Sequence, residues 1–321
     1  MTRAVVFAYH NVGVRCLSVL LAHGIEVALV VTHQDNPGET IWFDSVAELA
    51  AQHGLPCITP DDPNDTAVIA RIAALSPDFI FSFYYRLMLK PALLNLPRLG
   101  AYNMHGSLLP KYRGRVPVNW AVLRGERETG ASLHRMLEKP DAGAVVAQQA
   151  VPILPDDTAL VVFRKVTVAA EMALDNILPG LIHGTAEEIP QDLTQGSYFG
   201  GRKAEDGRID WRQSAQAIHN LVRAVAPPYP GAFCDIAGSP LRVLATLHPT
   251  GEIGKCGRPA FWVHQDKLVA ECGDGKLLRL LAVEFEGRQL SAAEWLAKFG
   301  TAPVFPDSQA DPSNISPISL P

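Results

Sequence analysis

Three polar side chains in two short segments of this chain could carry out chemistry together. Asn103 and His105 stand in the run Asn-Met-His-Gly-Ser-Leu-Leu-Pro, and Asp141 follows in Lys-Pro-Asp-Ala-Gly. An amide can stabilise an oxyanion, an imidazole can transfer a proton, and a carboxylate can orient that imidazole. Asn103 and His105 are two residues apart, so they would face the same side of a strand. The set indicates an acyl-type transfer.

The surrounding sequence predicts the elements that position this set. Strand-like apolar runs alternate with amphipathic stretches along the first half of the chain. Such βα repeats indicate an α/β fold with a Rossmann-like parallel sheet, whose ligands lie at the carboxyl ends of the strands. Strands are expected at residues 4–8, 25–31, 78–83, 129–137 and 144–151, with another ending at 105, and helices at residues 12–23, 45–53, 65–75, 117–124 and 157–177, the last ended by Pro179 and Gly180.

The composition of the chain changes after residue 198. Residues 1–198 form the predicted catalytic domain, and the polar, glycine-rich stretch 199–212 reads as a linker. A helix and five short strands, with the turn signal Gly-Asp-Gly at 273–275, predict a small OB-like β-barrel over residues 213–300. Residues 301–321 are rich in Pro, Ser and Asp, which predicts a flexible tail.

Composition and local motifs exclude several classes of protein. The net charge of −5 argues against bulk nucleic-acid binding. The five cysteines contain no C-x-x-C pair, and we expect no metal site. The first strand–helix junction has one glycine where a dinucleotide fingerprint needs three, which argues against NAD. The N-terminus lacks a signal-peptide pattern, and no apolar run reaches the roughly 18 residues that a membrane span needs. We therefore expect a cytoplasmic protein without membrane insertion.

The motif around Asn103 and His105, together with Asp141-Ala-Gly, resembles the signature of formyltransferases that use N10-formyltetrahydrofolate. Beyond this motif, the sequence over about residues 1–300 is similar to the formyltransferase half of the bifunctional UDP-4-amino-4-deoxy-L-arabinose formyltransferases. Those enzymes act in lipid A modification and polymyxin resistance. The dehydrogenase half of those enzymes has no counterpart here, so we expect the oxidative step on another protein. The stretches that carry this narrower resemblance are residues 5–10, 32–39, 81–86 and 198–202.

The resemblance implies a role for each residue of the set. His105 would transfer protons, Asn103 would stabilise the tetrahedral oxyanion, and Asp141 would raise the pKa of His105. N10-formyltetrahydrofolate is the implied co-substrate. Its implied contacts are Leu87, Met88, Leu89, Arg115, Leu137, Glu138, Lys139, Pro140 and Asp141. We place the nucleotide sugar across the linker and the barrel face, with Arg202 and Tyr229 as contacts.

Five functions fit these residues. The first is transfer of a formyl group to the 4-amine of UDP-4-amino-4-deoxy-L-arabinose. Two alternatives share its chemistry: methionyl-tRNA formyltransferase, against which the acidic charge balance argues, and an N-formyltransferase for another nucleotide-linked amino sugar. The fourth function is a formyltetrahydrofolate hydrolase, in which water replaces the amine. The fifth is a ligand-binding module without activity. The expected partners are small molecules, and a homo-oligomer is left open.

Overall fold

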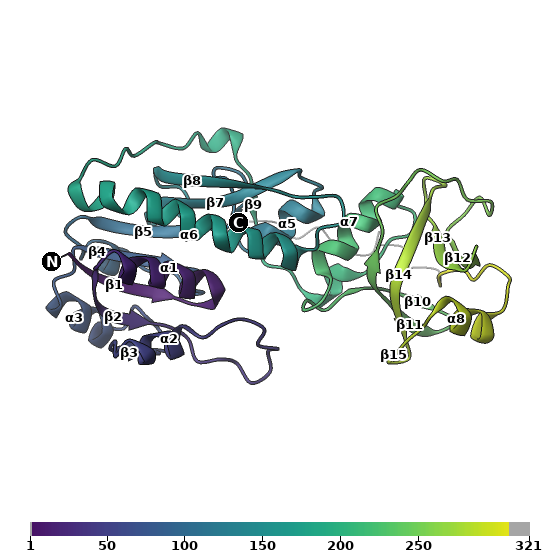
Figure 1. Cartoon of the computed structure of the whole chain (residues 1–321), viewed down its shortest axis with the longest axis horizontal. Coiled ribbons are helices and arrows are strands. Elements are labelled where there is room, and N and C mark those ends of the chain that lie inside the picture. Colours follow the sequence, from purple (N-terminus) through teal and green to yellow (C-terminus); the bar gives the residue numbers. More distant parts are fainter. Residues whose placement is uncertain (1, 308–321) are drawn as a thin grey trace. The chain divides into compact units, whose positions relative to one another are not determined.

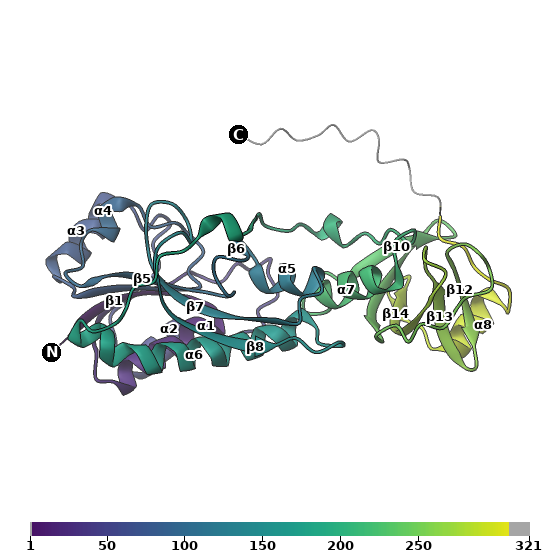
Figure 2. The same cartoon turned by 90° about the horizontal axis from the view of Figure 1, so that it is seen from above.

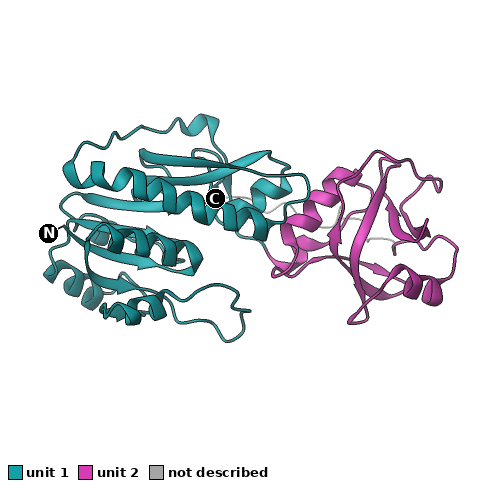
Figure 3. Ribbon diagram, in the orientation of Figure 1, with its two compact units in different colours: residues 1–202 teal, residues 203–321 magenta. Residues whose placement is uncertain are grey.

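The computed structural model of the chain describes residues 2–307. These residues form two compact units, one ending at Arg202 and the other beginning at Lys203 (Figure 3). Asn103, His105 and Asp141 all belong to unit 1. None of the described helices has both the length and the apolar character needed to cross a membrane.

A seven-stranded sheet forms the centre of unit 1, in the order β3-β2-β1-β4-β5-β7-β8 (Figure 1). The strands from β3 to β5 in this order run parallel, as the βα repeats predict. β7 runs antiparallel to β5 and to β8. The loop between β7 and β8 is too short for a crossover helix, so these two strands pair as a hairpin. The strands are β1 Arg3–Ala8, β2 Glu26–Val31, β3 Cys57–Ile58, β4 Phe79–Phe83, β5 Gly100–His105, β7 Glu128–Arg135 and β8 Val145–Pro152.

Helices cover the sheet, and α6 packs on β7, β8 and α1 (Figure 2). The prediction that this helix ends at Pro179 is wrong, because it continues to His183 and ends where Gly184 adopts a left-handed φ of 68°. Proline inside a helix costs about 3 kcal/mol. Burial of Leu178 and Leu181 beside it offsets that cost, at about 1.5–3 kcal/mol per side chain. The helices are α1 His10–Ala22, α2 Val46–Gln52, α3 Thr66–Ala74, α4 Pro91–Leu94, α5 Pro117–Leu123 and α6 Ala159–His183.

A small second sheet in unit 1 joins segments that are far apart in the sequence. β6 (Arg113–Gly114) pairs in parallel with β9 (Tyr198–Phe199), which follows the short 3-10 helix η1 (Leu193–Gln195). Phe199, where the expected linker begins, is thus part of a strand in unit 1. This pairing brings the end of unit 1 beside the loop that follows β5.

Unit 2 is built on an antiparallel sheet in the order β10-β11-β14-β13-β12, with β15 paired to β14. The turn at residues 273–275 joins β13 to β14, as its sequence predicts. Phe261 and Trp295 are fully buried in the core of this unit. Its elements are η2 Ala204–Gly207, α7 Ala215–Val225, β10 Ala232–Ile236, β11 Ser239–Thr246, β12 Ala260–His264, β13 Lys267–Glu271, β14 Leu277–Phe285, β15 Arg288–Gln289 and α8 Ala292–Phe299.

Residues 301–307, expected to begin a flexible tail, link the two edge strands of this sheet. Val304 pairs with Phe261 of β12, and the Asp307 amide donates to the carbonyl of Asp235 on β10 at 2.9 Å. The Asp307 carboxylate also accepts from the Gly238 amide at 2.9 Å. The rest of the expected tail, residues 308–321, lies outside the described residues.

Candidate active site

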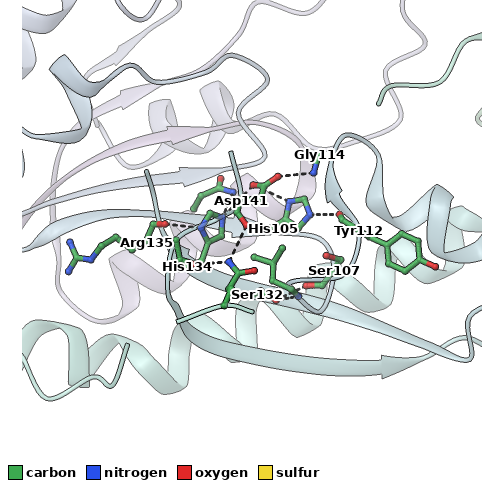
Figure 4. A network of polar contacts seen from close by, with 12 residues as sticks. His105, Ser107, Tyr112, Gly114, Ser132, His134, Arg135 and Asp141 are labelled. Carbon is green, nitrogen blue, oxygen red and sulfur yellow. Dashed lines mark hydrogen bonds and ion pairs between the residues drawn. The ribbon is translucent and has the colours of Figure 1, made fainter. Parts of the chain in front are cut away.

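The carboxyl end of β5 carries Asn103 and His105 at the edge where parallel sheets hold ligands. β7 lies beside this end of β5, with His134 opposite Asn103 and Ser132 opposite His105. Asp141 reaches the same place from the loop between β7 and β8 (Figure 4). The structure therefore brings together the three residues that the sequence singled out.

His105 is held with a defined tautomer. Its side chain is buried, and Nε2 lies 2.8 Å from the carbonyl oxygen of Tyr112. A carbonyl only accepts, so Nε2 carries the proton and Nδ1 is the nitrogen that gains and loses one. Nδ1 faces Oδ1 of Asp141 at 3.6 Å. Burial lowers the pKa of His105 from its ordinary value, although the Asp141 carboxylate and the Tyr112 carbonyl act to raise it.

Asp141 is an ionised carboxylate between two histidines. Its Oδ1 lies 3.6 Å from Nδ1 of His105 and 3.5 Å from Nε2 of His134. Its Oδ2 accepts from the Gly114 amide at 2.9 Å. Burial alone would raise the pKa of Asp141, but the positive charge of His105 when it is protonated and the hydrogen bond from the Gly114 amide hold it well below its usual range. The backbone of Asp141 has a left-handed φ of 50°, a strained conformation of the kind that persists at functional sites.

His134 is a member of this site that the sequence analysis missed. Its Nδ1 lies 2.9 Å from the Arg135 carbonyl and so carries the proton, which leaves Nε2 to accept from Nδ2 of Asn103 at 3.1 Å. This contact fixes which end of the Asn103 amide faces β7. A signal did exist, because Ser132 and His134 are polar residues two apart, on either side of Leu133, within the expected strand.

A buried hydroxyl fixes the loop that follows His105. Ser132 Oγ donates to the Ser107 carbonyl at 2.6 Å and accepts from the Leu109 amide at 3.1 Å and from Gln148 Nε2 at 2.9 Å (Figure 4). Gly106, at the start of this loop, lies against the Tyr84 ring. A Cβ at Gly106 would come within 1.9 Å of the Tyr84 hydroxyl oxygen, so only glycine fits there.

The residues expected to contact folate lie on three loops, which follow β4, β6 and β7. Leu87 and Met88 follow β4 and are 41% and 56% exposed, and Leu137 follows β7 and is 49% exposed. Exposed apolar side chains of this kind suit a flat heterocycle. Leu89 differs, because its side chain is buried in the core of unit 1. The other expected contacts are Arg115, Glu138 and Lys139, which are exposed, and Pro140, which is partly buried.

The two residues expected to contact the nucleotide have different surroundings. Arg202 belongs to unit 1, where its guanidinium lies 4.9 Å from the centre of the Trp120 ring. Tyr229 belongs to unit 2 and packs partly against the core of that unit.

Comparison with known families gives the class of this protein. The family of formyl transferases matches residues 8–178, and the C-terminal domain of formyl transferases matches residues 202–300. The chain therefore belongs to the formyl transferase family and is a formyltransferase. Asn103, His105 and Asp141 all lie within the first matched region.

Several solved structures share its fold. The N-formyltransferase from Helicobacter canadensis, determined with folinic acid and dTDP-3-aminofucose, is 21% identical over 87% of this chain and 99% of its own, with a TM-score of 0.67. The sugar 3N-formyltransferase WlaRD, determined with dTDP and 5-N-formyl-THF, is 19% identical over 90% and 99%, with a TM-score of 0.69. HypX from Aquifex aeolicus, in complex with tetrahydrofolic acid, is 18% identical over 92% and 47%, with a TM-score of 0.62.

Proposed function

We propose that this enzyme transfers the formyl group of N10-formyltetrahydrofolate to the amine of a nucleotide-linked amino sugar, with UDP-4-amino-4-deoxy-L-arabinose as the acceptor. The observation that carries formyl transfer is the meeting of Asn103, His105 and Asp141 at the carboxyl end of β5. The fold likeness to enzymes determined with folates and with dTDP or a dTDP-linked amino sugar supports the donor and the class of acceptor. The resemblance of residues 32–39 and 198–202 to UDP-4-amino-4-deoxy-L-arabinose formyltransferases supports the particular sugar.

Each residue has a task in this reaction. The acceptor amine attacks the formyl carbon, and the Asn103 amide stabilises the negative charge that develops on the formyl oxygen. The lowered pKa of His105 keeps its imidazole neutral near pH 7, so Nδ1 accepts the proton that the amine loses. Asp141 stabilises the resulting imidazolium. When the bond from the formyl carbon to N10 breaks, His105 returns the proton to N10, and the amide product leaves without a covalent enzyme intermediate.

The test is a panel of acceptors with one donor. The protein is incubated with N10-formyltetrahydrofolate and, in separate reactions, UDP-4-amino-4-deoxy-L-arabinose, a dTDP-linked 3-amino sugar, charged initiator methionyl-tRNA, or no amine. Mass spectrometry identifies the formylated product and an enzymatic assay measures free formate. We expect the UDP-linked sugar to have the highest kcat/KM. Preference for another sugar would correct the acceptor, whereas preference for the tRNA, or formate release that no amine accelerates, would overturn the proposal.

A further inference from the structure

Two backbone groups of one three-residue segment hold both the catalytic imidazole and its carboxylate. The carbonyl of Tyr112 accepts from His105 Nε2 at 2.8 Å, and the amide of Gly114 donates to Asp141 Oδ2 at 2.9 Å (Figure 4). The two groups lie on either side of Arg113. The separation of His105 Nδ1 and Asp141 Oδ1 therefore depends on where the segment 112–114 lies.

This segment has a conformation that needs outside support. Tyr112 has a φ of 57°, and Gly114 has a φ of 97°. A left-handed residue other than glycine costs about 1–3 kcal/mol and persists only where its surroundings stabilise it. Gly114 also has no room for a side chain, because a Cβ there would lie 2.2 Å from the carbonyl oxygen of Phe199.

Ser197 and the strand β9 that follows it supply the support, through backbone carbonyls and one hydroxyl. The Arg113 amide donates to the Ser197 carbonyl at 2.9 Å, and the Arg115 amide donates to the Phe199 carbonyl at 2.9 Å. Ser197 Oγ accepts from the Tyr112 amide at 2.8 Å. The amides of residues 112, 113 and 115 are thus all bound by residues 197–199.

Ring stacking fixes the same segment from its side chains. The Tyr112 ring stacks on Phe199, with ring centres 5.4 Å apart and planes within 15°. Phe199 stacks in turn on Trp120 of α5, at 4.7 Å and 25°. The Tyr112 hydroxyl donates to Glu126 at 2.7 Å. Phe199 is therefore the central ring of a three-ring stack that begins at the residue bound to His105.

We infer that Ser197 and Phe199 are positioning residues for formyl transfer, which act on His105 and Asp141 through the backbone of residues 112–114. This inference rests on the proposed function of His105 and Asp141. Both act indirectly, because the groups that bind His105 and Asp141 are the Tyr112 carbonyl and the Gly114 amide. The neighbouring Tyr198 is 59% exposed and provides a matched control on the same strand.

The test compares Ser197→Ala and Phe199→Leu with the control Tyr198→Leu. Loss of the support lets Asp141 and His105 separate, so kcat should fall about tenfold or more with an unchanged KM for the formyl donor. The acid limb of the pH–rate profile should move to lower pH, because the carboxylate that raises the pKa of His105 acts less strongly. Phe199→Tyr keeps the ring stack and should retain wild-type kcat, and Tyr198→Leu should change neither quantity.

Nuclear magnetic resonance of the imidazole nitrogens gives a readout that needs no acceptor. We expect His105 with its proton on Nε2 in the wild type and a mixture of tautomers in Ser197→Ala and Phe199→Leu. If the wild type formylates no amine, the proposed function fails, yet this spectrum still tests the inference. If both variants keep the wild-type tautomer of His105 and the wild-type pH profile, the inference is overturned. A loss of thermal stability without a change in the tautomer or the pH profile would also overturn it. Ser197→Ala, the smaller change, decides the matter if Phe199→Leu does not fold.

Discussion

The hydroxyl of Ser132 offers a quantitative test of how the loop that follows His105 is held. Ser132 is fully buried on β7, and its Oγ makes three hydrogen bonds, to the Ser107 carbonyl, the Leu109 amide and the Gln148 side chain. Each such bond contributes about 1 kcal/mol net, and removing the hydroxyl leaves buried partners unpaired. Ser132→Ala should therefore lower the free energy of unfolding of unit 1 by about 3 kcal/mol.

Differential scanning calorimetry measures this loss, with a control on the same strand. In a unit of about 200 residues, a loss of 1 kcal/mol lowers the midpoint of thermal unfolding by about 2–4 °C, so Ser132→Ala should lower that midpoint by roughly 6–12 °C. Thr129 is also buried on β7, but its hydroxyl has no hydrogen-bond partner among residues 2–307. Thr129→Val should leave the midpoint unchanged or raise it. Equal losses in the two variants, or none in Ser132→Ala, would refute the reasoning.

Three further outcomes follow from the geometry of the site. Asn103→Ala removes the oxyanion donor and should lower kcat about 10²–10³-fold with little change in KM, which steady-state kinetics would reveal. The rate should fall as pH drops through the lowered pKa of His105. Because the Asp141 carboxylate raises that pKa, Asp141→Asn should move the acid limb of the pH–rate profile to still lower pH. An acid limb at the same pH in Asp141→Asn would contradict this reasoning. Gly106→Ala should lose activity because its Cβ would collide with the Tyr84 hydroxyl. The double variant Gly106→Ala/Tyr84→Phe should recover part of that activity in steady-state kinetics. No recovery would exclude the collision as the cause.

The sequence predicted the parts of the site that depend on local patterns. Asn103 and His105 share a strand face because they are two residues apart, and the βα repeats predicted their place at the sheet edge. Asp141 was singled out as a carboxylate that could orient the imidazole, and the structure brings it to His105. His134 was missed because its part in the site depends on β7 pairing opposite Asn103, which is a long-range contact.

Other features escaped prediction because they involve backbone groups or burial. The Tyr112 carbonyl and the Gly114 amide bind the catalytic pair, and backbone groups have no signature in the sequence. The pKa of His105 falls, although Asp141 raises it as expected, because burial in the folded unit outweighs the carboxylate. Pro179 did not end its helix, since the buried leucines on both sides stabilise the longer form. Residues 301–307 pair with two sheet edges through their backbone, although they belong to a stretch, 301–321, that is rich in Pro, Ser and Asp.

The most direct test of the central claim follows a labelled formyl group in a single turnover. The wild type, His105→Gln and the control His53→Gln, an exposed histidine after α2, are mixed with labelled N10-formyltetrahydrofolate and UDP-4-amino-4-deoxy-L-arabinose. We predict that the wild type and His53→Gln move the label to the sugar amine, and that His105→Gln does so about 100-fold more slowly while it binds folate equally well. Transfer by His105→Gln at the wild-type rate, or release of the label as formate by the wild type in the presence of the amine, would contradict the account.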